Sequence, residues 1–206
     1  MKVQNWVLGG GGHAKVVIAT MESDGLRVSG IFDDDERKIG KHVLNVEILG
    51  PTPDENWWLA ETRNAIIAIG DNHLREKLSS IRAVWMTAQH VNAIVHPSVT
   101  IGEGSLICAG VIVQPDTKIG RHVIANTSCS IDHDCRISDF AHVGPGANLA
   151  GGVSVGVRSF VGAGATITPG VNIGDDVIVG AGAVVIDDVA SGKTVVGVPA
   201  REVDYE

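Results

Sequence analysis

A histidine flanked by two aspartates is the clearest catalytic candidate in this chain of 206 residues, in the segment IDHDC at residues 131–135. A carboxylate beside an imidazole holds the ring in one tautomer and raises its basicity, which suits a general base. Asp132 and Asp134 stand on either side of His133. The pattern predicts that His133 removes a proton from an attacking group. The alternative is a surface histidine in a solvated acidic loop.

A glycine-rich turn near the start of the chain has the pattern of a phosphate-binding turn. Gly9, Gly11 and Ala14 fit G-x-G-x-x-A after an apolar run, and Asp33 follows about twenty residues later. Such a turn aims backbone N–H groups at a phosphate close to the N-terminus of a helix. The residues before 93 suffice for about half of a doubly wound dinucleotide domain, so we expect a nucleotide-sugar diphosphate rather than NAD. A turn that serves only packing is the alternative.

Charge and hydropathy argue against several classes of protein. Sixteen basic and 24 acidic residues give a formal net charge of −8, and no run of Lys or Arg offers a surface for nucleic acid. Mean hydropathy is +0.19, yet no apolar stretch reaches the roughly 18 residues that a membrane span needs. The first residues lack the layout of a signal peptide, and three cysteines do not form a disulfide framework, so we expect a cytoplasmic protein without membrane insertion.

Residues 1–92 alternate between strand-like and helix-like patterns. Apolar runs and helix-like spacing predict three strands and three helices, in the order strand 3–8, helix 13–21, strand 28–32, helix 55–61, strand 65–69 and helix 72–81. Strands and helices that alternate at these intervals indicate a small parallel α/β sheet. Residues 38–55 contain no pattern from which a nucleotide base can be predicted.

From Val95 onward, the sequence repeats with a period of six residues. Fifteen of the sixteen positions counted in sixes from Val95 to Val185 are Val, Ile or Leu, and the exception is Ala125. The residue four places later is small or β-branched throughout. Cys129 and Cys135 take this small position, so we expect buried, inert thiols there. The unbroken count is the strongest structural signal in the sequence.

One aliphatic and one small residue per hexad are typical of a parallel β-solenoid, in which the aliphatic side chain fills the axis and the small one lets the chain turn. Three hexads close one coil, so sixteen hexads predict about five coils within residues 93–206. Seven glycines directly follow an aliphatic residue, and we expect them to adopt a backbone angle that only glycine reaches cheaply: Gly102, Gly120, Gly144, Gly156, Gly162, Gly174 and Gly180.

These features together resemble a known family. The hexads, IDHDC, the segment GGGGHAKVV at residues 9–17 and the closing VGVPAR at residues 196–201 are similar to those of bacterial sugar acetyltransferases of the NeuD/PglD type, in the hexapeptide-repeat acyltransferase superfamily. The resemblance covers nearly the whole chain. It implies a Rossmann-like N-terminal unit, a left-handed β-helix, a homotrimer with active sites between subunits, and acetyl-CoA as co-substrate.

The resemblance also assigns roles to individual residues. His133 is then the general base and Asp134 the neighbour that raises its basicity. Three residues are implied to contact acetyl-CoA, namely His142, Ala163 and Ala181, although a structural hydrogen bond between subunits is the alternative for His142. Asn126, next to the weak axial position, is predicted to hold substrate or to orient catalytic groups, against the alternative of a simple Asn ladder. The remaining residues implied to bind the nucleotide sugar are Gly11, Gly12, His13, Asp33, Asp34 and Gly70.

We therefore predict an acetyl-CoA-dependent N-acetyltransferase that acts on the 4-amino group of a nucleotide-linked 4-amino-4,6-dideoxysugar, in surface polysaccharide or glycan biosynthesis. O-acetylation of sialic acid or a related sugar is the alternative, because one branch of the resembling family carries it out. A non-enzymatic nucleotide-binding scaffold is a third hypothesis. No metal is expected. The rival hypothesis is the zinc site of a carbonic anhydrase on the same solenoid, which uses three histidines at subunit interfaces, and the coils here offer His122, His133 and His142. That class of enzyme lacks the N-terminal nucleotide unit, and two of these histidines already have assigned roles.

Overall fold

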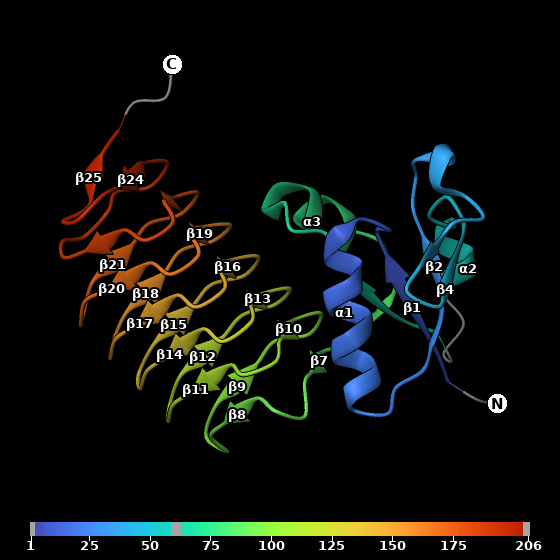
Figure 1. The fold of residues 1–206 in the computed structure, drawn as a ribbon, viewed down its shortest axis with the longest axis horizontal. Helices are drawn as coiled ribbons and strands as arrows, with labels where there is room; N and C mark the ends of the chain where they lie inside the picture. Colours follow the sequence, from blue (N-terminus) through green and yellow to red (C-terminus); the bar gives the residue numbers. More distant parts are fainter. Residues whose placement is uncertain (1–2, 59–62, 204–206) are drawn as a thin grey trace.

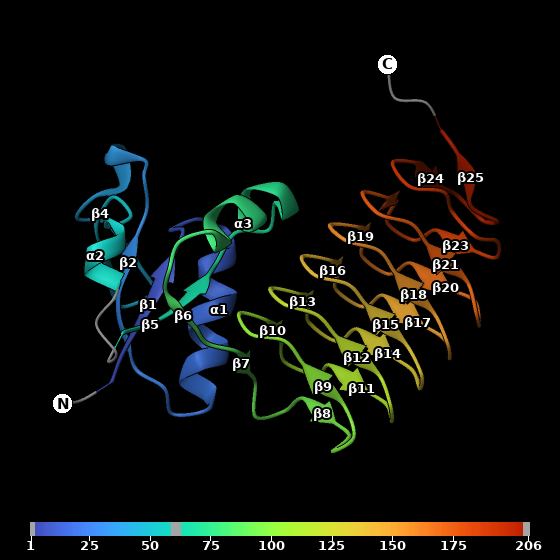
Figure 2. The ribbon, with the colours of Figure 1, turned by 180° about the vertical axis from the view of Figure 1, so that it is seen from behind.

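The structure is a computed structural model that describes residues 3–58 and 63–203. A sheet with helices forms the N-terminal part, and a three-sided solenoid forms the rest (Figure 1). Helix α1 (Gly12–Ser23) lies between the N-terminal sheet and the first coils of the solenoid (Figures 1 and 2). Among the described residues, no helix has the length and apolar character needed to cross a bilayer.

The N-terminal sheet has six strands in the order β3-β4-β2-β1-β5-β6. The central strand β1 (Gln4–Leu8) pairs in parallel with β2 (Val28–Phe32) and β5 (Arg63–Ile67). Together, these three strands correspond to the three that were predicted from the sequence. The antiparallel pair formed by β3 and β4 was not predicted, because β3 is too short to show alternation. The outer strands are β3 (His42–Val43), β4 (Val46–Gly50) and β6 (Val84–Trp85).

Short helices follow the carboxyl ends of the strands. Asp71 caps the third helix, since its carboxylate accepts a hydrogen bond from the Leu74 N–H at 2.7 Å. Gly11 precedes α1 and offers no side-chain cap. Of the helix predicted at residues 55–61, the structure describes residues 55–58, which form α2, and the predicted residues 59–61 lie outside the described part of the chain. The helices are α1, a 3-10 turn (Glu36–Lys38), α2 (Glu55–Trp58) and α3 (Asn72–Ser79).

The solenoid is built from strands of two or three residues that pair in register with the strand one coil later. Leu106 pairs with Ile124, which pairs with His142, so one coil contains 18 residues. Three parallel sheets have eight, six and five members, and the largest ends in the antiparallel strand β25. Five coils are therefore complete. The first strand, β7, precedes the boundary predicted between residues 92 and 93.

The three sheets take their strands in rotation along the chain. The first sheet contains β7 (Ala88–Gln89), β10 (Leu106–Ile107), β13 (Ile124–Ala125), β16 (His142–Val143), β19 (Phe160–Val161), β22 (Ile178–Val179), β24 (Thr194–Val196) and β25 (Arg201–Glu202). The second sheet contains β8 (Ile94–Val95), β11 (Ile112–Val113), β14 (Ser130–Ile131), β17 (Asn148–Leu149), β20 (Thr166–Ile167) and β23 (Val184–Val185). The third sheet contains β9 (Thr100–Ile101), β12 (Lys118–Ile119), β15 (Arg136–Ile137), β18 (Ser154–Val155) and β21 (Asn172–Ile173).

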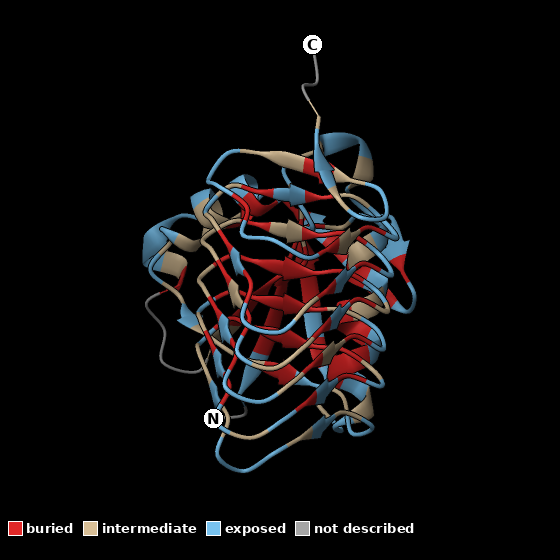
Figure 3. Ribbon diagram, turned by 90° about the vertical axis from the view of Figure 1, so that its left-hand side faces the viewer, coloured by how far each residue is buried: buried red, intermediate tan, exposed pale blue. Residues whose placement is uncertain are grey.

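The predicted axial residues form the core of the solenoid (Figure 3). Fourteen of the sixteen are buried, and the other two, Val95 and Ile101, are partly buried in the first coil. Polar residues at the small position are satisfied by the backbone of the following coil: the hydroxyls of Ser105, Thr117 and Ser159 donate to carbonyls at 2.8, 2.7 and 2.6 Å. The hexads therefore specify an apolar axis with internally bonded corners.

The glycines that follow the axial residues are needed for a reason other than the one predicted. None of the seven has a positive φ; the left-handed positions lie two residues later, as at Gly104, Gly146 and Gly164. A Cβ at Gly156 would lie 2.4 Å from the backbone C and O of Gly174 in the next coil. Because adjacent coils approach so closely there, a side chain does not fit. The expectation based on backbone angle was wrong.

Helix α3 joins the two parts through the buried polar side chains of Asn72 and Arg75. The Nδ2 of Asn72 donates to the carbonyl of Arg158 at 2.6 Å. Arg75 donates from Nε to the carbonyl of His122 at 2.8 Å and from Nη2 to that of Phe140 at 2.5 Å. These three acceptors are 18 residues apart in sequence and so lie in three successive coils. The helix is fixed against all three.

The guanidinium of Arg75 is held by neutral acceptors from both parts of the chain. Arg75 is only 1% exposed. Its Nη1 donates hydrogen bonds to the carbonyls of Ile69 and Gly70 at 3.1 and 3.3 Å. Burial lowers the pKa of Arg75 to about 10, which leaves the group charged at neutral pH. Removing the guanidinium would leave buried carbonyls of the loop after β5 and of the solenoid without hydrogen-bond donors.

Replacing Arg75 with Met should lower the free energy of unfolding by about 3 kcal/mol, because several buried carbonyls lose a charged donor. Arg82→Met changes an exposed arginine of the same region and should leave the urea midpoint unchanged. Urea unfolding followed by tryptophan fluorescence measures both variants. Equal midpoints for the two would show that the junction does not depend on Arg75.

Candidate active site

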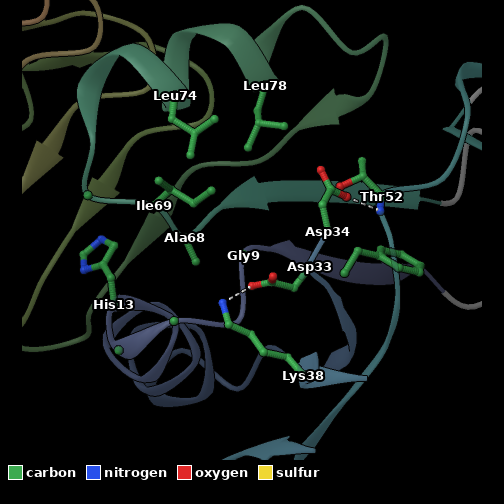
Figure 4. Close-up of a pocket in the computed structure, with 14 residues that line it drawn as sticks. Gly9, His13, Asp33, Asp34, Lys38, Thr52, Ala68, Ile69, Leu74 and Leu78 are labelled. Carbon is green, nitrogen blue, oxygen red and sulfur yellow. Dashed lines mark hydrogen bonds and ion pairs between the residues drawn. The ribbon is translucent and has the colours of Figure 1, made fainter. Parts of the chain in front are cut away.

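A cavity of about 390 Å³ opens where the carboxyl ends of β1, β2 and β5 meet (Figure 4). This edge is where open α/β sheets bind their ligands. Its wall brings together the six residues of the N-terminal part that the family resemblance implies for the nucleotide sugar: Gly11, Gly12, His13, Asp33, Asp34 and Gly70. We refer to it below as the first cavity.

Two electropositive features border the first cavity. Helix α1 has twelve residues, begins directly after Gly11, and has no side chain that caps its first amides. Lys38 lies in the cavity wall with its Nζ 2.8 Å from Asp33 Oδ2 (Figure 4). A helix N-terminus and an ammonium group both favour an anion. This end of the cavity therefore suits a phosphate-bearing ligand.

The carboxylate of Asp33 fixes the shape of the glycine-rich turn. Its Oδ2 accepts hydrogen bonds from the Gly10 N–H at 2.6 Å and from Lys38, and its Oδ1 accepts one from the Asp35 N–H at 2.9 Å. Burial by itself raises the pKa of Asp33, but the hydrogen bonds from Lys38, Gly10 and Asp35 lower it on balance. Asp33 therefore holds the turn in place as well as lining the cavity.

A half-buried histidine from the N-terminal part and a buried one from the solenoid lie close together at the junction. His13 is in the first turn of α1 and His142 is on β16, and their ring centroids are 6.3 Å apart. Asn126 donates from Nδ2 to His142 Nε2 at 3.0 Å, while its Oδ1 accepts from the Thr127 N–H. Since Nε2 of His142 accepts this bond, the proton of the neutral ring is assigned to Nδ1. Asn126 thus orients His142.

Both junction histidines are neutral and incompletely bonded. Burial lowers the pKa of His142 to about 3 and also lowers that of His13, and the charge of Arg75 adds to both effects. In the described part of the chain, His13 Nε2 and His142 Nδ1 are buried without a hydrogen-bond partner. Such atoms are uncommon and mark places where a ligand or water completes the bonding. Gly70 lines the first cavity and also a second one of about 480 Å³, which reaches His142.

His133 lies in the exposed turn after β14, where its side chain is 61% exposed. Its Nδ1 is 2.8 Å from Asp134 Oδ2, so the ring donates to Asp134 and leaves Nε2 unprotonated. Asp132 instead accepts from the His133 backbone N–H at 2.8 Å. The hydrogen bond to Asp134, followed by the charge of Asp132, raises the pKa of His133. Of the two aspartates, Asp134 is therefore the one that polarises the ring.

The predicted site residues form separate groups on the chain. His133 lies at the corner between the second and third sheets, whereas His142 is on the first sheet. Ala163 and Ala181 occupy exposed turns after β19 and β22, one coil apart, at the corner between the first and second sheets. Neither cavity described above is lined by His133. The candidate base and the first cavity are thus apart within one chain.

Two polar residues of the first cavity had no recognisable signal in the sequence. Lys38 and Thr52 both belong to residues 38–55, where no pattern could be interpreted. The Thr52 N–H donates to Asp34 Oδ1 at 2.8 Å, so the end of this segment reaches the acidic pair.

The remaining candidate residues are packed in the interior. Burial raises the pKa of the free thiols of Cys108 and Cys129 to about 12 and also raises that of Cys135. His122 stacks on Phe140 with 5.5 Å between ring centroids. Across residues 3–58 and 63–203, no group of three or more His, Cys, Asp or Glu side chains is placed to hold a metal ion.

Comparison with known families and curated proteins gives matches in both parts. Residues 6–81 match the PglD N-terminal domain, and residues 91–115 and 152–186 match the hexapeptide repeat of succinyl-transferase. A GDP-perosamine N-acetyltransferase from Escherichia coli is 36% identical over 93 residues, and an uncharacterized protein of Acanthamoeba polyphaga mimivirus is 32% identical over 112 residues. These matches cover 43% and 53% of this chain, but only 42% and 22% of the curated relatives, so the chain spans less than half of their length.

Solved structures match over nearly the whole chain. A histidine-to-asparagine variant of perosamine N-acetyltransferase from Caulobacter crescentus, in complex with CoA and GDP-perosamine, is 40% identical with a TM-score of 0.92, over 98% of this chain and 97% of the other. The acetyltransferase domain of PglB from Neisseria gonorrhoeae, in complex with acetyl coenzyme A, is 33% identical with a TM-score of 0.90, over 98% and 100%.

The matches agree with the resemblance that the motifs indicated. The N-terminal unit is Rossmann-like, and the solenoid is the left-handed β-helix of hexapeptide-repeat proteins. The likeness extends over both parts of the chain at once, which a shared solenoid alone would not produce. This protein therefore belongs to the NeuD/PglD-type sugar acetyltransferases of the hexapeptide-repeat acyltransferase superfamily.

Proposed function

We propose that this protein is an acetyl-CoA-dependent N-acetyltransferase that acts on the 4-amino group of a nucleotide-linked 4-amino-4,6-dideoxysugar. The observation that carries the proposal is the exposed imidazole of His133, held 2.8 Å from Asp134, on a chain 40% identical to a perosamine N-acetyltransferase. The first cavity supports the proposal independently, because the glycine-rich turn and Lys38 in its wall suit the diphosphate of a nucleotide sugar.

GDP-perosamine is the first acceptor to test. The Caulobacter crescentus protein whose structure holds this compound matches 98% of the present chain. In the first cavity, Leu74 and Leu78 offer an apolar wall for a base, and Asp34 offers a carboxylate to the N–H donors of guanine. These three side chains are the features of the cavity that bear on the choice of nucleotide.

In the proposed mechanism, the sugar amine attacks the thioester directly and no acyl-enzyme forms. His133 takes the ammonium proton at Nε2, since Nδ1 donates to Asp134. The new C–N bond forms and the C–S bond breaks. The second proton that the nitrogen loses as the amide forms is taken up by the departing sulfur of CoA, which leaves as the thiol. The contacts to acetyl-CoA are proposed for His142, Ala163 and Ala181.

We also propose that the active site forms between subunits of a homotrimer. Within one chain, His133 lies at a different corner of the solenoid from Ala163 and Ala181 and lines neither cavity. A neighbouring copy that brought its own His133 beside His142 would unite base, acetyl donor and sugar. A cytoplasmic role in surface polysaccharide or glycan synthesis is proposed too, supported by three free, buried cysteines.

Thiol release from acetyl-CoA, measured against GDP-, dTDP- and UDP-linked 4-amino sugars and free sialic acid, tests the proposed reaction. We expect release with a nucleotide-linked amino sugar, GDP-perosamine first. Release with sialic acid alone would instead identify an O-acetyltransferase. If no thiol is released and a thermal-shift assay detects no binding of acetyl-CoA, the result would favour the hypothesis of a non-enzymatic scaffold.

His133→Asn should lower kcat by about a hundredfold to ten-thousandfold while binding of acetyl-CoA persists, because the base is lost and the scaffold is kept. His96→Asn is the matched control: this exposed solenoid histidine hydrogen-bonds Ser98 at 3.0 Å, and no carboxylate of residues 3–58 or 63–203 pairs with it. Steady-state rates and calorimetric binding measure the two effects. Native turnover in His133→Asn would refute the assigned base.

Asp134→Asn should move the acidic limb of the pH–rate profile to lower pH. The bond to Asp134 raises the pKa of His133 above its ordinary value of 6.5, and a base is active when neutral, so native activity rises through a midpoint above 6.5. Losing that carboxylate lowers the pKa and therefore the midpoint. Asp132→Asn is the control and should shift it less, because Asp132 bonds the backbone. Initial rates across the limb measure both, and an unchanged midpoint in Asp134→Asn would contradict the assignment.

A further inference from the structure

The imidazole of His133 lies directly over a glycine of the next coil. Gly151 follows His133 by one coil, as the pairing of Ile131 with Leu149 shows. A Cβ at Gly151 would lie 2.6 Å from both Cε1 and Nε2 of His133 and 3.2 Å from its Nδ1. Atoms of a side chain and a ring do not approach so closely in folded proteins. The ring thus occupies the space that a side chain at position 151 would need.

Backbone geometry does not require a glycine at this position. Gly151 is not among the left-handed residues, whereas Gly152 has a φ of +73°. At five of the seven glycines that follow axial residues, a Cβ would first meet the backbone of the next coil, whereas the three atoms nearest to a Cβ at Gly151 all belong to His133. The same corner carries Pro115 one coil before His133 and Pro169 one coil after Gly151. The absence of a Cβ at Gly151 therefore leaves room for the imidazole of His133.

We propose that Gly151 is a positioning residue for His133: its lack of a side chain lets the ring lie where Nδ1 donates to Asp134 and Nε2 stays free to take a proton. The inference rests on the proposed function, since it concerns the same base. Any larger residue at 151 turns the ring away and breaks the 2.8 Å bond to Asp134. Because the His133 side chain is 61% exposed, it moves without disturbing the core.

Displacing the ring changes both its orientation and its basicity. The charged groups that face it are Asp134, which bonds the ring, and Asp132, which bonds the backbone N–H of His133. When the ring turns, the contact with Asp134 is lost and Asp132 remains as the nearby charge. The variant therefore loses rate through misplacement and also shifts its pH dependence in the direction expected for Asp134→Asn.

Gly151→Ala tests the proposal in the full-length protein with acetyl-CoA and GDP-perosamine. We expect kcat to fall about tenfold to a hundredfold, because a displacement of about 1 Å costs rates of that order. The KM for acetyl-CoA should stay within about twofold, and the urea midpoint should be unchanged, as a displaced surface ring leaves the coils intact. The midpoint of the acidic limb, and the titration of the His133 Cε1–H resonance, should both move to lower pH.

The same substitution in a His133→Asn background is the matched control. If Gly151 acts through the imidazole, adding Gly151→Ala to His133→Asn changes the residual rate by less than about twofold. Equal losses in both backgrounds would overturn the proposal. So would a native kcat with a native His133 titration in Gly151→Ala. Failure of the proposed function has a different signature, namely native turnover in His133→Asn itself.

Discussion

The buried guanidinium of Arg75 sets the geometry on which both halves of the site depend. A cation removed from water is costly unless its donors are used, and carbonyl groups from the sheet loop and from successive coils surround this one. Neutral acceptors leave its charge uncancelled, so its field reaches His13 and His142 and favours their neutral forms. One side chain therefore fixes the loop after β5, at Ile69 and Gly70, relative to the solenoid, and also favours the neutral forms of His13 and His142.

Environment divides the histidines of the site into two chemical kinds. At the junction, burial and a cation make His142 a neutral hydrogen-bonding group, oriented by Asn126. At the exposed corner, a carboxylate makes His133 more basic than an ordinary imidazole. His133 follows β14 and His142 is on β16, and β15 of the third sheet lies between these two strands along the chain. A proton acceptor and a neutral hydrogen-bonding group can thus operate at one pH because the solenoid places the two rings in different environments, one at an exposed corner and one at the buried junction.

The solenoid was predictable because each coil repeats the contacts of the one before, so a period of six residues encodes strand, corner and axis together. Gly11 and Asp33 followed from a glycine pattern that encodes a backbone shape, whereas Gly12, His13, Asp34 and Gly70 were implied only by the family resemblance. Arg75 and Gly151 could not be identified in the same way, since their partners are carbonyls or a ring one or more coils away, and such contacts leave no local pattern. The same cause explains the glycines after axial residues, whose role is to allow close approach of coils rather than an unusual angle. Lys38 was hidden because its segment lacks periodicity.

The fixed coil of 18 residues constrains how this architecture can change over evolutionary time. Inserting one residue between His122 and Arg158 would rotate every later side chain about the axis, expose the aliphatic positions, and misalign the carbonyls that receive Arg75 and Asn72. Duplicating a whole coil beyond Ala181 would lengthen the prism and leave the junction and the His133 corner untouched. Homologues are therefore expected to differ in length by modules of constant size near the C-terminal end, while the central coils tolerate substitutions but not insertions or deletions.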